Sequence, residues 1–340
     1  MTTPRTATPP RHRGPATGPN ATGPNATGPN AIGAALGLLG DEWRLLIVRS
    51  AFEGARRYVD WKERLPVSDA VLTARLRSLV DGGVLRRVPA AIMPGRHEYE
   101  LTAAGRDLWV LLLTIWDWER RHVAGQADRL PSMVHTDCTN VFHPVACCAA
   151  CRSAVELDDV TALFGPSGGF ARSVPVGAHR RRSGRRTTPG DASASPASDA
   201  GPGLFPDTMA VIGNRWSAAV VGAAVLGARR FRDFERALGV PPTVLTERLR
   251  SFVALGVLDD DGAAYRLTTK GAALFSIVIA LVAWGERWVP AADGPAVLAT
   301  HVACGAPFVP AWSCSECGGE LRRDTIGIVG HPIVERSHPH

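Results

Sequence analysis

The sequence lacks the features that would place the chain in a membrane or send it out of the cell. No apolar stretch follows residues 1–5, so no export leader is expected. The longest apolar run, residues 275–284, is about half of what a bilayer span needs. We therefore expect a cytoplasmic location, in which the two Asn-Ala-Thr sequons at Asn20 and Asn25 have no consequence.

The sequence also lacks the usual marks of an enzyme. It has no nucleophile motif, phosphate-binding loop or pair of carboxylates on one predicted helix face, so we expect no catalytic activity. An enzyme that uses Cys and His is the alternative. The chain is basic, with 38 Lys+Arg against 32 Asp+Glu and a net charge of +6. That balance favours an anionic partner such as nucleic acid, although high-GC genomes also favour arginine.

Three stretches of the chain have too little to bury to offset the entropy of folding. Residues 1–30 are rich in Pro, Thr, Gly and Asn and predict a disordered N-terminal tail. Residues 165–203 predict a flexible basic linker, whose arginine cluster at 180–186 is either a solvated tether or an arm that grips phosphate. Residues 329–340 predict a C-terminal tail.

An internal repeat is the most informative feature. Two segments, one on each side of the linker, align without a gap over their first part and again after a short deletion in the second copy. The matching pairs include Gly40 and Gly213, Trp43 and Trp216, Leu72 and Leu245, Gly105 and Gly271, Trp118 and Trp284, and Cys151 and Cys317. Chance does not keep a register over so many positions, so the chain contains two copies of one complete unit.

Each copy predicts several helices, a hairpin and a long apolar helix. In the first copy, apolar periodicity predicts helices over residues 36–52, 57–65 and 69–82, and a hairpin over 84–101. Residues 103–122, rich in Leu and Trp, have more apolar surface than a small domain can cover, so we expect self-association there. The expected fold class is mainly α with small β wings (α+β), as tandem winged helix-turn-helix domains over residues 31–125 and 204–290.

The third of these helices has one face that suits DNA. Leu72, Leu76 and Leu79 form its buried stripe. The opposite face is small, hydroxylated and basic, which fits the major groove, although an ordinary solvated face is the alternative for this helix alone. The DNA-binding residues expected are Ser68, Ala70, Thr73, Ala74 and Arg77 on the first helix, Arg86, Arg87 and Arg96 on its wing, and Thr243, Thr246, Glu247 and Arg250 on the second helix.

The second wing is shorter than the first and acidic. It is cut to residues 259–264, which begin with three aspartates. Carboxylates near phosphate are repulsive. We therefore expect the first copy to bind double-stranded DNA fully, and the second either to bind a weaker half-site or to serve mainly as the pairing partner.

Cysteine and histidine recur with one spacing after each long helix, His-x2-Cys-x9-Cys-x2-Cys. Three thiolates and an imidazole form a tetrahedral set for Zn²⁺, and a closed set of four predicts structural rather than catalytic zinc. We expect two structural zinc sites, one in each zinc-ribbon-like Cys3His appendage, over residues 130–160 and 297–328; buried free thiols are the alternative. The expected ligands are His135, Cys138, Cys148, Cys151, His301, Cys304, Cys314 and Cys317. The spare Cys147 could replace one of them.

Several linked motifs resemble one family of regulators. Trp43-Arg-Leu-Leu-Ile-Val-Arg, Val71-Leu-Thr-Ala-Arg-Leu-Arg-Ser and Tyr99-Glu-Leu-Thr-Ala-Ala-Gly are similar to the HxlR family of winged helix-turn-helix regulators. The resemblance implies a three-helix core with a wing, a dimer formed through terminal helices, operator binding, and a response to reactive small molecules or redox state. It also implies a sensing cysteine ahead of the first tryptophan, but Asn30 and Gly203 stand there in the two copies.

We therefore expect a sequence-specific transcriptional regulator that acts as an intramolecular pseudo-dimer or a homodimer. One alternative is a winged-helix and zinc-ribbon factor that docks on RNA polymerase or another protein. Another is a regulator that responds to zinc or to oxidation of its thiolates.

Overall fold

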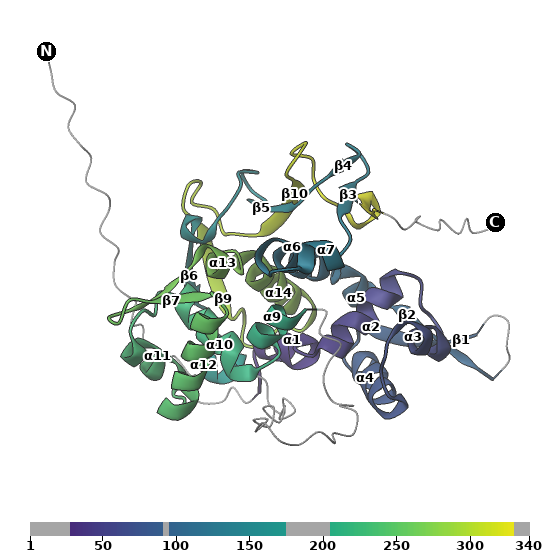
Figure 1. Ribbon diagram of the computed structural model, residues 1–340, viewed down its shortest axis with the longest axis horizontal. Coiled ribbons are helices and arrows are strands. Elements are labelled where there is room, and N and C mark those ends of the chain that lie inside the picture. The colour runs from purple at the N-terminus through teal and green to yellow at the C-terminus, as the bar shows by residue number, and fades with distance from the viewer. Residues whose placement is uncertain (1–27, 91–94, 175–204, 330–340) are drawn as a thin grey trace, which may run out of the picture.

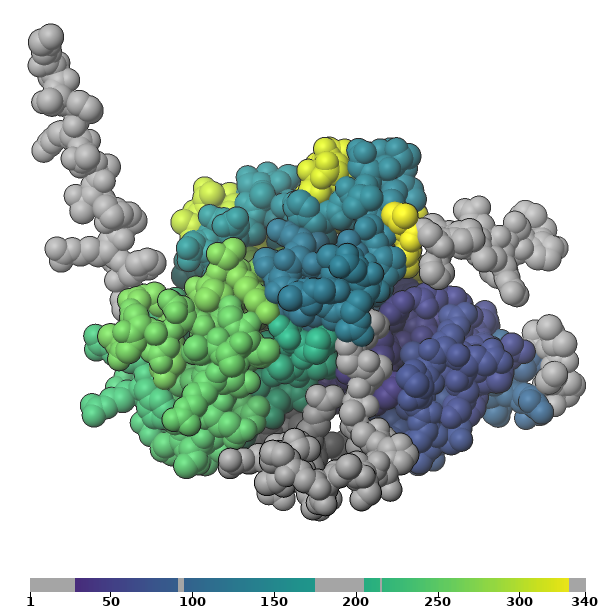
Figure 2. All heavy atoms as spheres, viewed as in Figure 1, coloured from purple at the N-terminus to yellow at the C-terminus, as the bar shows by residue number. Residues whose placement is uncertain are grey.

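The computed structural model describes residues 28–90, 95–174 and 205–329. Most of the expected N-terminal tail, linker and C-terminal tail falls outside these ranges. The two copies lie side by side in one body, with the Cys/His appendages together on one side of it (Figures 1 and 2).

The first copy has the elements that its periodicity predicts. They are α1 (Ala31–Leu39), α2 (Glu42–Phe52), α3 (Tyr58–Arg64), α4 (Asp69–Asp81), β1 (Leu85–Pro89), β2 (His97–Leu101), α5 (Ala103–Asp107) and α6 (Trp109–His122). The second copy repeats this order as α9 (Pro206–Ile212), α10 (Arg215–Val225), α11 (Phe231–Leu238), α12 (Pro242–Ala254), β7 (Leu258–Asp260), β8 (Tyr265–Leu267), α13 (Thr269–Ala272) and α14 (Phe275–Trp288).

Local sequence signals set the ends of α4 and of its counterpart α12. Ser68 caps α4 by accepting a hydrogen bond from the Val71 amide, whereas α12 begins with Pro242 and has no side-chain cap. Both helices end at a glycine with positive φ, Gly83 at 69° and Gly256 at 68°. Glycine adopts this left-handed conformation without the cost that a Cβ would bring.

Each copy buries its own aromatic core beneath its wing. Trp61 is fully buried and meets Tyr99 edge-on, with the ring centroids 5.6 Å apart. At the matching positions, Phe234 is fully buried and meets Tyr265 at 6.2 Å. A matching aromatic pair therefore lies beneath the wing of each copy, within one continuous hydrophobic core.

The long helices join the two copies. Helix α6 packs against α14, α1 of the first copy packs on α14, and α9 of the second packs on α6. Two hydrogen bonds cross this interface in a matched pair: the Trp118 Nε1 donates to the Lys270 carbonyl at 3.0 Å, and the Trp284 Nε1 donates to the Ala104 carbonyl at 2.9 Å. The apolar surface of the terminal helices is thus covered within the described chain itself.

The appendages exchange strands between the copies. Their elements are α7 (Gln126–Arg129), β3 (Met133–His135), β4 (Asn140–Val141), β5 (Pro144–Cys148) and β6 (Val160–Phe164) after α6, and β9 (Val297–His301), β10 (Pro310–Cys314) and β11 (Ile326–Ile328) after α14. Strand β5 pairs antiparallel with β10, and Ala146 faces Trp312 at the centre of that register. Strand β3 pairs with β11, and β9 pairs with β6 in the equivalent register. This reciprocal pairing has the symmetry of a two-fold dimer interface.

The ordered part of the chain extends beyond the expected start of the linker. Residues 165–174 are described and include the short helix α8 (Phe170–Ser173), which packs on α1. The buried Asn30 side chain donates from Nδ2 to the Ser167 carbonyl at 3.1 Å and to the Ser173 hydroxyl at 2.9 Å. Asn30 therefore has a structural role at the position where the family resemblance implies a sensing cysteine. Gly203 lies outside the described residues.

One helical stretch of the described chain is long and apolar enough to cross a membrane by length and composition alone. It covers Thr269–Trp288, 20 residues with a mean hydropathy of 1.4, and half of it is buried inside the molecule. The stretch is longer than the apolar run counted from the sequence because α13 and α14 follow each other closely. Its burial against α1 and α6 is that of a core helix.

Candidate nucleic-acid interface and metal centres

One pair of matching helices, α4 and α12, lies on one side of the molecule. Helices α4 and α12 are both on the side away from the appendages, and the hairpins β1–β2 and β7–β8 lie towards opposite ends (Figure 1). A winged-helix dimer that binds successive turns of duplex DNA presents two helices on one side in this way.

Helix α4 presents the residues that the sequence singled out. Leu72, Leu76 and Leu79 are buried beneath it, as expected. The predicted contact residues on its other side are all exposed: Ser68, Ala70, Thr73, Ala74 and Arg77. Within the described chain, the Arg77 side chain is in no ion pair or hydrogen bond with protein, so its guanidinium is available to an outside acceptor.

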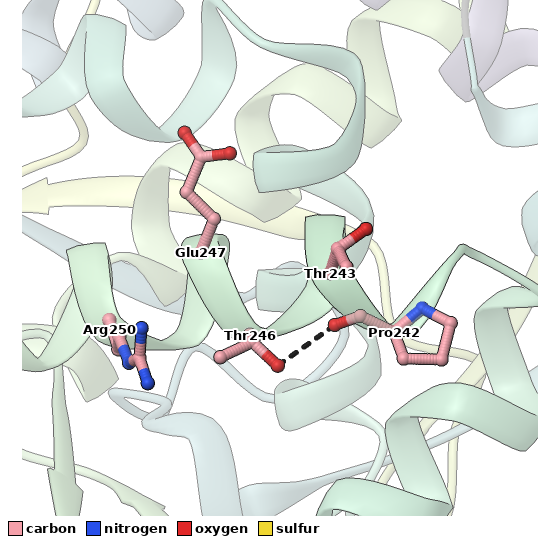
Figure 3. Close-up of a pocket in the computed structure, with 5 residues that line it drawn as sticks. All are labelled: Pro242, Thr243, Thr246, Glu247 and Arg250. Carbon is pink, nitrogen blue, oxygen red and sulfur yellow. Dashed lines mark hydrogen bonds between the residues drawn. The ribbon is translucent and has the colours of Figure 1, made fainter.

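Helix α12 presents a similar face with an added acid. Thr243, Thr246, Glu247 and Arg250 line a hollow together with Pro242 at the start of the helix (Figure 3). The Thr246 hydroxyl donates to the Pro242 carbonyl at 2.8 Å, and Glu247 pairs with Arg248 at 2.9 Å. A hydroxyl held by its own helix is less available to a base edge.

Only some of the arginines on the first wing are without a partner in the described part of the protein. Arg86 forms an ion pair with Glu100 at 2.7 Å, and Arg87 lies over the Tyr99 ring at 5.6 Å from its centroid. The hydrogen bond from Arg86, together with the nearby charge of Arg56, lowers the pKa of Glu100. Arg96 is exposed at the turn and is in no ion pair within the described residues.

One aspartate of the second wing stabilises the turn between its two strands through hydrogen bonds. Asp261 accepts hydrogen bonds from the amides of Ala263 and Ala264 and pairs with Arg266. The Ala263 amide, the Arg266 guanidinium and the Ala264 amide together lower the pKa of Asp261 to about 2. Asp259 remains exposed on the wing and keeps its repulsion towards phosphate.

The cysteines and histidines form two clusters, but not the two that the sequence spacing predicts. One contains His135 and Cys138 from the first appendage with Cys314 and Cys317 from the second. The other contains Cys148, Cys151, His301 and Cys304. The expectation of one set within each appendage is therefore corrected: all eight expected residues take part, and each cluster takes two from each copy. The exchange of strands β3, β5, β9 and β10 is the physical reason.

The geometry of each cluster fits a tetrahedral Cys3His site. The candidate ligand atoms within each cluster lie within 4.8 Å of one another. Sulfurs of Cys138 and Cys314 are 3.9 Å apart, and the Cys317 sulfur is 3.3 Å from the His135 Nδ1. Zinc bonds of about 2.3 Å to sulfur and 2.0 Å to nitrogen at tetrahedral angles place such atoms roughly 3.5 to 3.8 Å apart.

Backbone amides donate to sulfurs of both clusters and lower the pKa of one thiol in each, whereas burial and neighbouring thiols raise the pKa of Cys314 and Cys304. The amides of Glu316 and Gly319 donate to the sulfurs of Cys314 and Cys317, each at 3.4 Å. The Asn140 amide lowers the pKa of Cys138 to about 7, and the Ser153 amide lowers that of Cys151 to about 6. A lowered thiol pKa favours the form that binds a metal ion.

Cys147 belongs to neither cluster. It is buried, and its sulfur lies 3.1 Å from the Ser313 hydroxyl. The expectation that this spare cysteine could replace a ligand finds no support in the geometry, because its side chain faces the strand of the other copy.

A family of regulators matches both copies of this fold. The HxlR-like helix-turn-helix family matches residues 38–127 and again residues 211–293, which together make up half of the chain. The chain belongs to this family. Its winged helix-turn-helix fold and its duplication thereby agree with the expectation from the quoted motifs.

Two relatives of this HxlR-like chain are similar to only part of its length. An uncharacterized HTH-type transcriptional regulator of Mycobacterium tuberculosis H37Rv is 36% identical over 135 residues, which are 40% of this chain and 85% of the relative. The HTH-type transcriptional regulator YtcD of Bacillus subtilis is 31% identical over 91 residues, 26% of this chain and 72% of the relative. Each relative is thus near the length of one copy.

A solved structure also matches one copy. That of the transcription factor PA1607 is 42% identical and covers 26% of this chain and 61% of its own, with a TM-score of 0.25.

Proposed function

We propose that this HxlR-like chain is a sequence-specific DNA-binding transcriptional regulator, with its two copies acting as one intramolecular pseudo-dimer. The observation that carries the proposal is the placement of α4 and α12 on one side of the molecule, each with its apolar stripe in a core and its polar face exposed. The names of the matched relatives, HTH-type transcriptional regulators, support the same function.

The residues proposed to contact DNA differ in their roles. Thr73 and Arg77 of α4 are positioned to reach base edges, and Arg96 of the first wing to reach phosphate. Thr243, Thr246 and Arg250 of α12 reach a second half-site more weakly, because the acids of the second copy oppose them. The expected bounds of the two winged helix-turn-helix domains, residues 31–125 and 204–290, and a cytoplasmic location are part of this proposal.

Fluorescence anisotropy with the full chain and duplex DNA from upstream of its own gene tests the proposal. We expect a complex that depends on sequence, with an affinity that falls steeply as salt rises. Sedimentation of the complex reports whether one chain or two bind each duplex. A chain that ignores duplex DNA of every sequence at low salt contradicts the proposal and favours a protein-docking factor.

We further propose that both Cys3His clusters hold structural zinc. The ligand set is closed, with four protein ligands and no open position for water, which suits a structural ion. His135 and His301 are buried, and the Nδ1 of each lies 3.1 to 3.5 Å from two cysteine sulfurs of its cluster, which favours Nδ1 as the ligand atom. Bound zinc would fasten one copy to the other.

Elemental analysis of protein purified without chelator tests this second proposal. We expect about two zinc ions per chain. Removal with a strong chelator should loosen the pairing of the copies and lower the melting temperature, because metal binding free energy is folding free energy in such sites. Protein that contains no metal and folds equally well with and without added zinc rules the proposal out.

A further inference from the structure

An apolar cavity of about 640 Å³ lies between α10 and α14 of the second copy and the strand pair β6–β9, and residues of α1 and α8 from the first half of the chain also line it. Ala218 and Gly222 of α10 and Val278 and Val282 of α14 line it with half-buried small side chains. Small-molecule sites in proteins have volumes of roughly 300 to 1,000 Å³ and are mostly apolar. The cavity therefore has the size and lining of a ligand site.

The first copy shows that the fold does not require this cavity. At the positions that match Ala218, Gly222 and Val282, it has Leu45, Arg49 and Trp116. The Arg49 guanidinium lies over the Trp116 ring at 4.7 Å, and the Trp116 Nε1 donates to the Pro131 carbonyl at 2.8 Å. Large side chains that pack on one another thus occupy the place that three small residues leave open in the second copy.

Trp312 supplies a polar group without a partner at this cavity. It lines the cavity, and only 9% of its surface is exposed. Its Nε1 is buried and has no acceptor among the residues that the structure describes. A buried donor without an acceptor costs free energy that a ligand's oxygen can recover. The first copy has Ala146 at the matching position, so the donor is another feature of one half alone.

The carboxylates at the cavity already have polar partners within the protein. The Asp107 carboxylate accepts from the Trp288 Nε1 at 2.8 Å and lies 3.6 Å from Arg287. The Glu286 carboxylate accepts from the Ala296 amide at 2.7 Å. These carboxylates are already hydrogen-bonded and the lining is otherwise mostly apolar, so the site suits a neutral molecule.

We propose that this cavity binds one neutral, largely apolar small molecule that carries a hydrogen-bond acceptor such as a carbonyl oxygen. The apolar body lies between α10 and α14, and the acceptor receives the Trp312 Nε1–H. Phe275 and Phe308, stacked with centroids 6.4 Å apart, form one wall suited to a flat ring. Helix α10 also packs against α12, so the bound molecule touches the element that supports the second recognition helix.

Two fluorescent probes test the proposal on the full chain in the absence of DNA. Prodan is a neutral naphthalene ketone, and N-phenyl-1-naphthylamine is a neutral amine without a carbonyl. We expect both to bind saturably at one molecule per chain. If neither probe binds saturably, the proposal is overturned. No DNA is present, so this result does not depend on the regulatory function proposed above.

Variants that carry the first copy's residues locate the site. Val282→Trp and Ala218→Leu each reduce the affinity for both probes by roughly tenfold or more. The control Leu298→Trp adds the same side chain at an exposed residue outside the cavity lining and keeps the affinity. Melting temperatures verify folding, and either filling variant suffices if the other is unfolded. Trp312→Phe weakens Prodan about fivefold, the value of one hydrogen bond, and leaves N-phenyl-1-naphthylamine unchanged. Wild-type affinity in both filled variants, or equal loss of both probes in Trp312→Phe, overturns the assignment.

Discussion

The two copies share their scaffold and differ in what they present to other molecules. Trp61 and Phe234 fill the same core position, and Trp118 and Trp284 make matched hydrogen bonds across the interface. The wings and the residues around α10, in contrast, have diverged. A residue that one copy uses to contact the other must fit its partner, so a change in one copy affects both. A surface that faces other molecules can change in one copy alone.

The metal clusters offer the sharpest test of how the copies are joined. Cys138 shares a cluster with Cys317 but an appendage with Cys151. The double variant Cys138→Ser/Cys317→Ser should therefore keep one tightly bound zinc per chain, because the other cluster is intact. Cys138→Ser/Cys151→Ser should keep none, because each cluster loses one of its four ligands.

Zinc retained under competition with a chromogenic chelator measures both variants. Each pair removes two thiols, so the variants serve as controls for each other. The reverse result, with one zinc retained only in Cys138→Ser/Cys151→Ser, would show that each appendage binds its own ion.

The recognition helices should contribute unequally to DNA binding. Arg77→Ala should weaken operator binding about tenfold or more, since a specific arginine contact to a base is worth about 1 to 3 kcal/mol. Arg250→Ala should cost only about threefold, because Glu247 and the acidic wing already weaken that half. Anisotropy titrations at one salt concentration, with Arg121→Ala as a control away from α4, measure both. Equal losses would mean that the two copies bind DNA alike.

The interface tryptophans should contribute equally. Trp118→Phe and Trp284→Phe each remove one hydrogen bond between the copies, so each should lower the free energy of unfolding by about 1 to 2 kcal/mol. Denaturant titration measures both, and each is the matched control of the other. A difference larger than about 1 kcal/mol would show that the pairing is less symmetric than the two bonds indicate.

The smallest effect is expected at the second wing. Asp259→Asn removes an exposed negative charge and should tighten DNA binding about twofold at low salt, with the gain disappearing at high salt where charges are screened. Affinity measured across a salt series tests this. A gain that persists at high salt would be incompatible with a repulsion between Asp259 and phosphate.

Much of this structure was predictable because its signals are local. The stripe of Leu72, Leu76 and Leu79, the Ser68 cap and the glycine ends define α4 from sequence alone. The eight Cys and His residues were predictable from their spacing, but their grouping was not, since local and exchanged clusters have the same spacing. The cavity was not predicted either. It exists because several residues of the second copy are smaller than their counterparts in the first, and only the fold shows that these positions lie next to one another.

The register of β5 against β10 has a consequence for how the molecule behaves on dilution. Both strands belong to one polypeptide, so their association is intramolecular and its equilibrium is independent of protein concentration. A single-copy relative that assembles from two chains would dissociate when scarce. A tethered pair remains assembled even at a few molecules per cell.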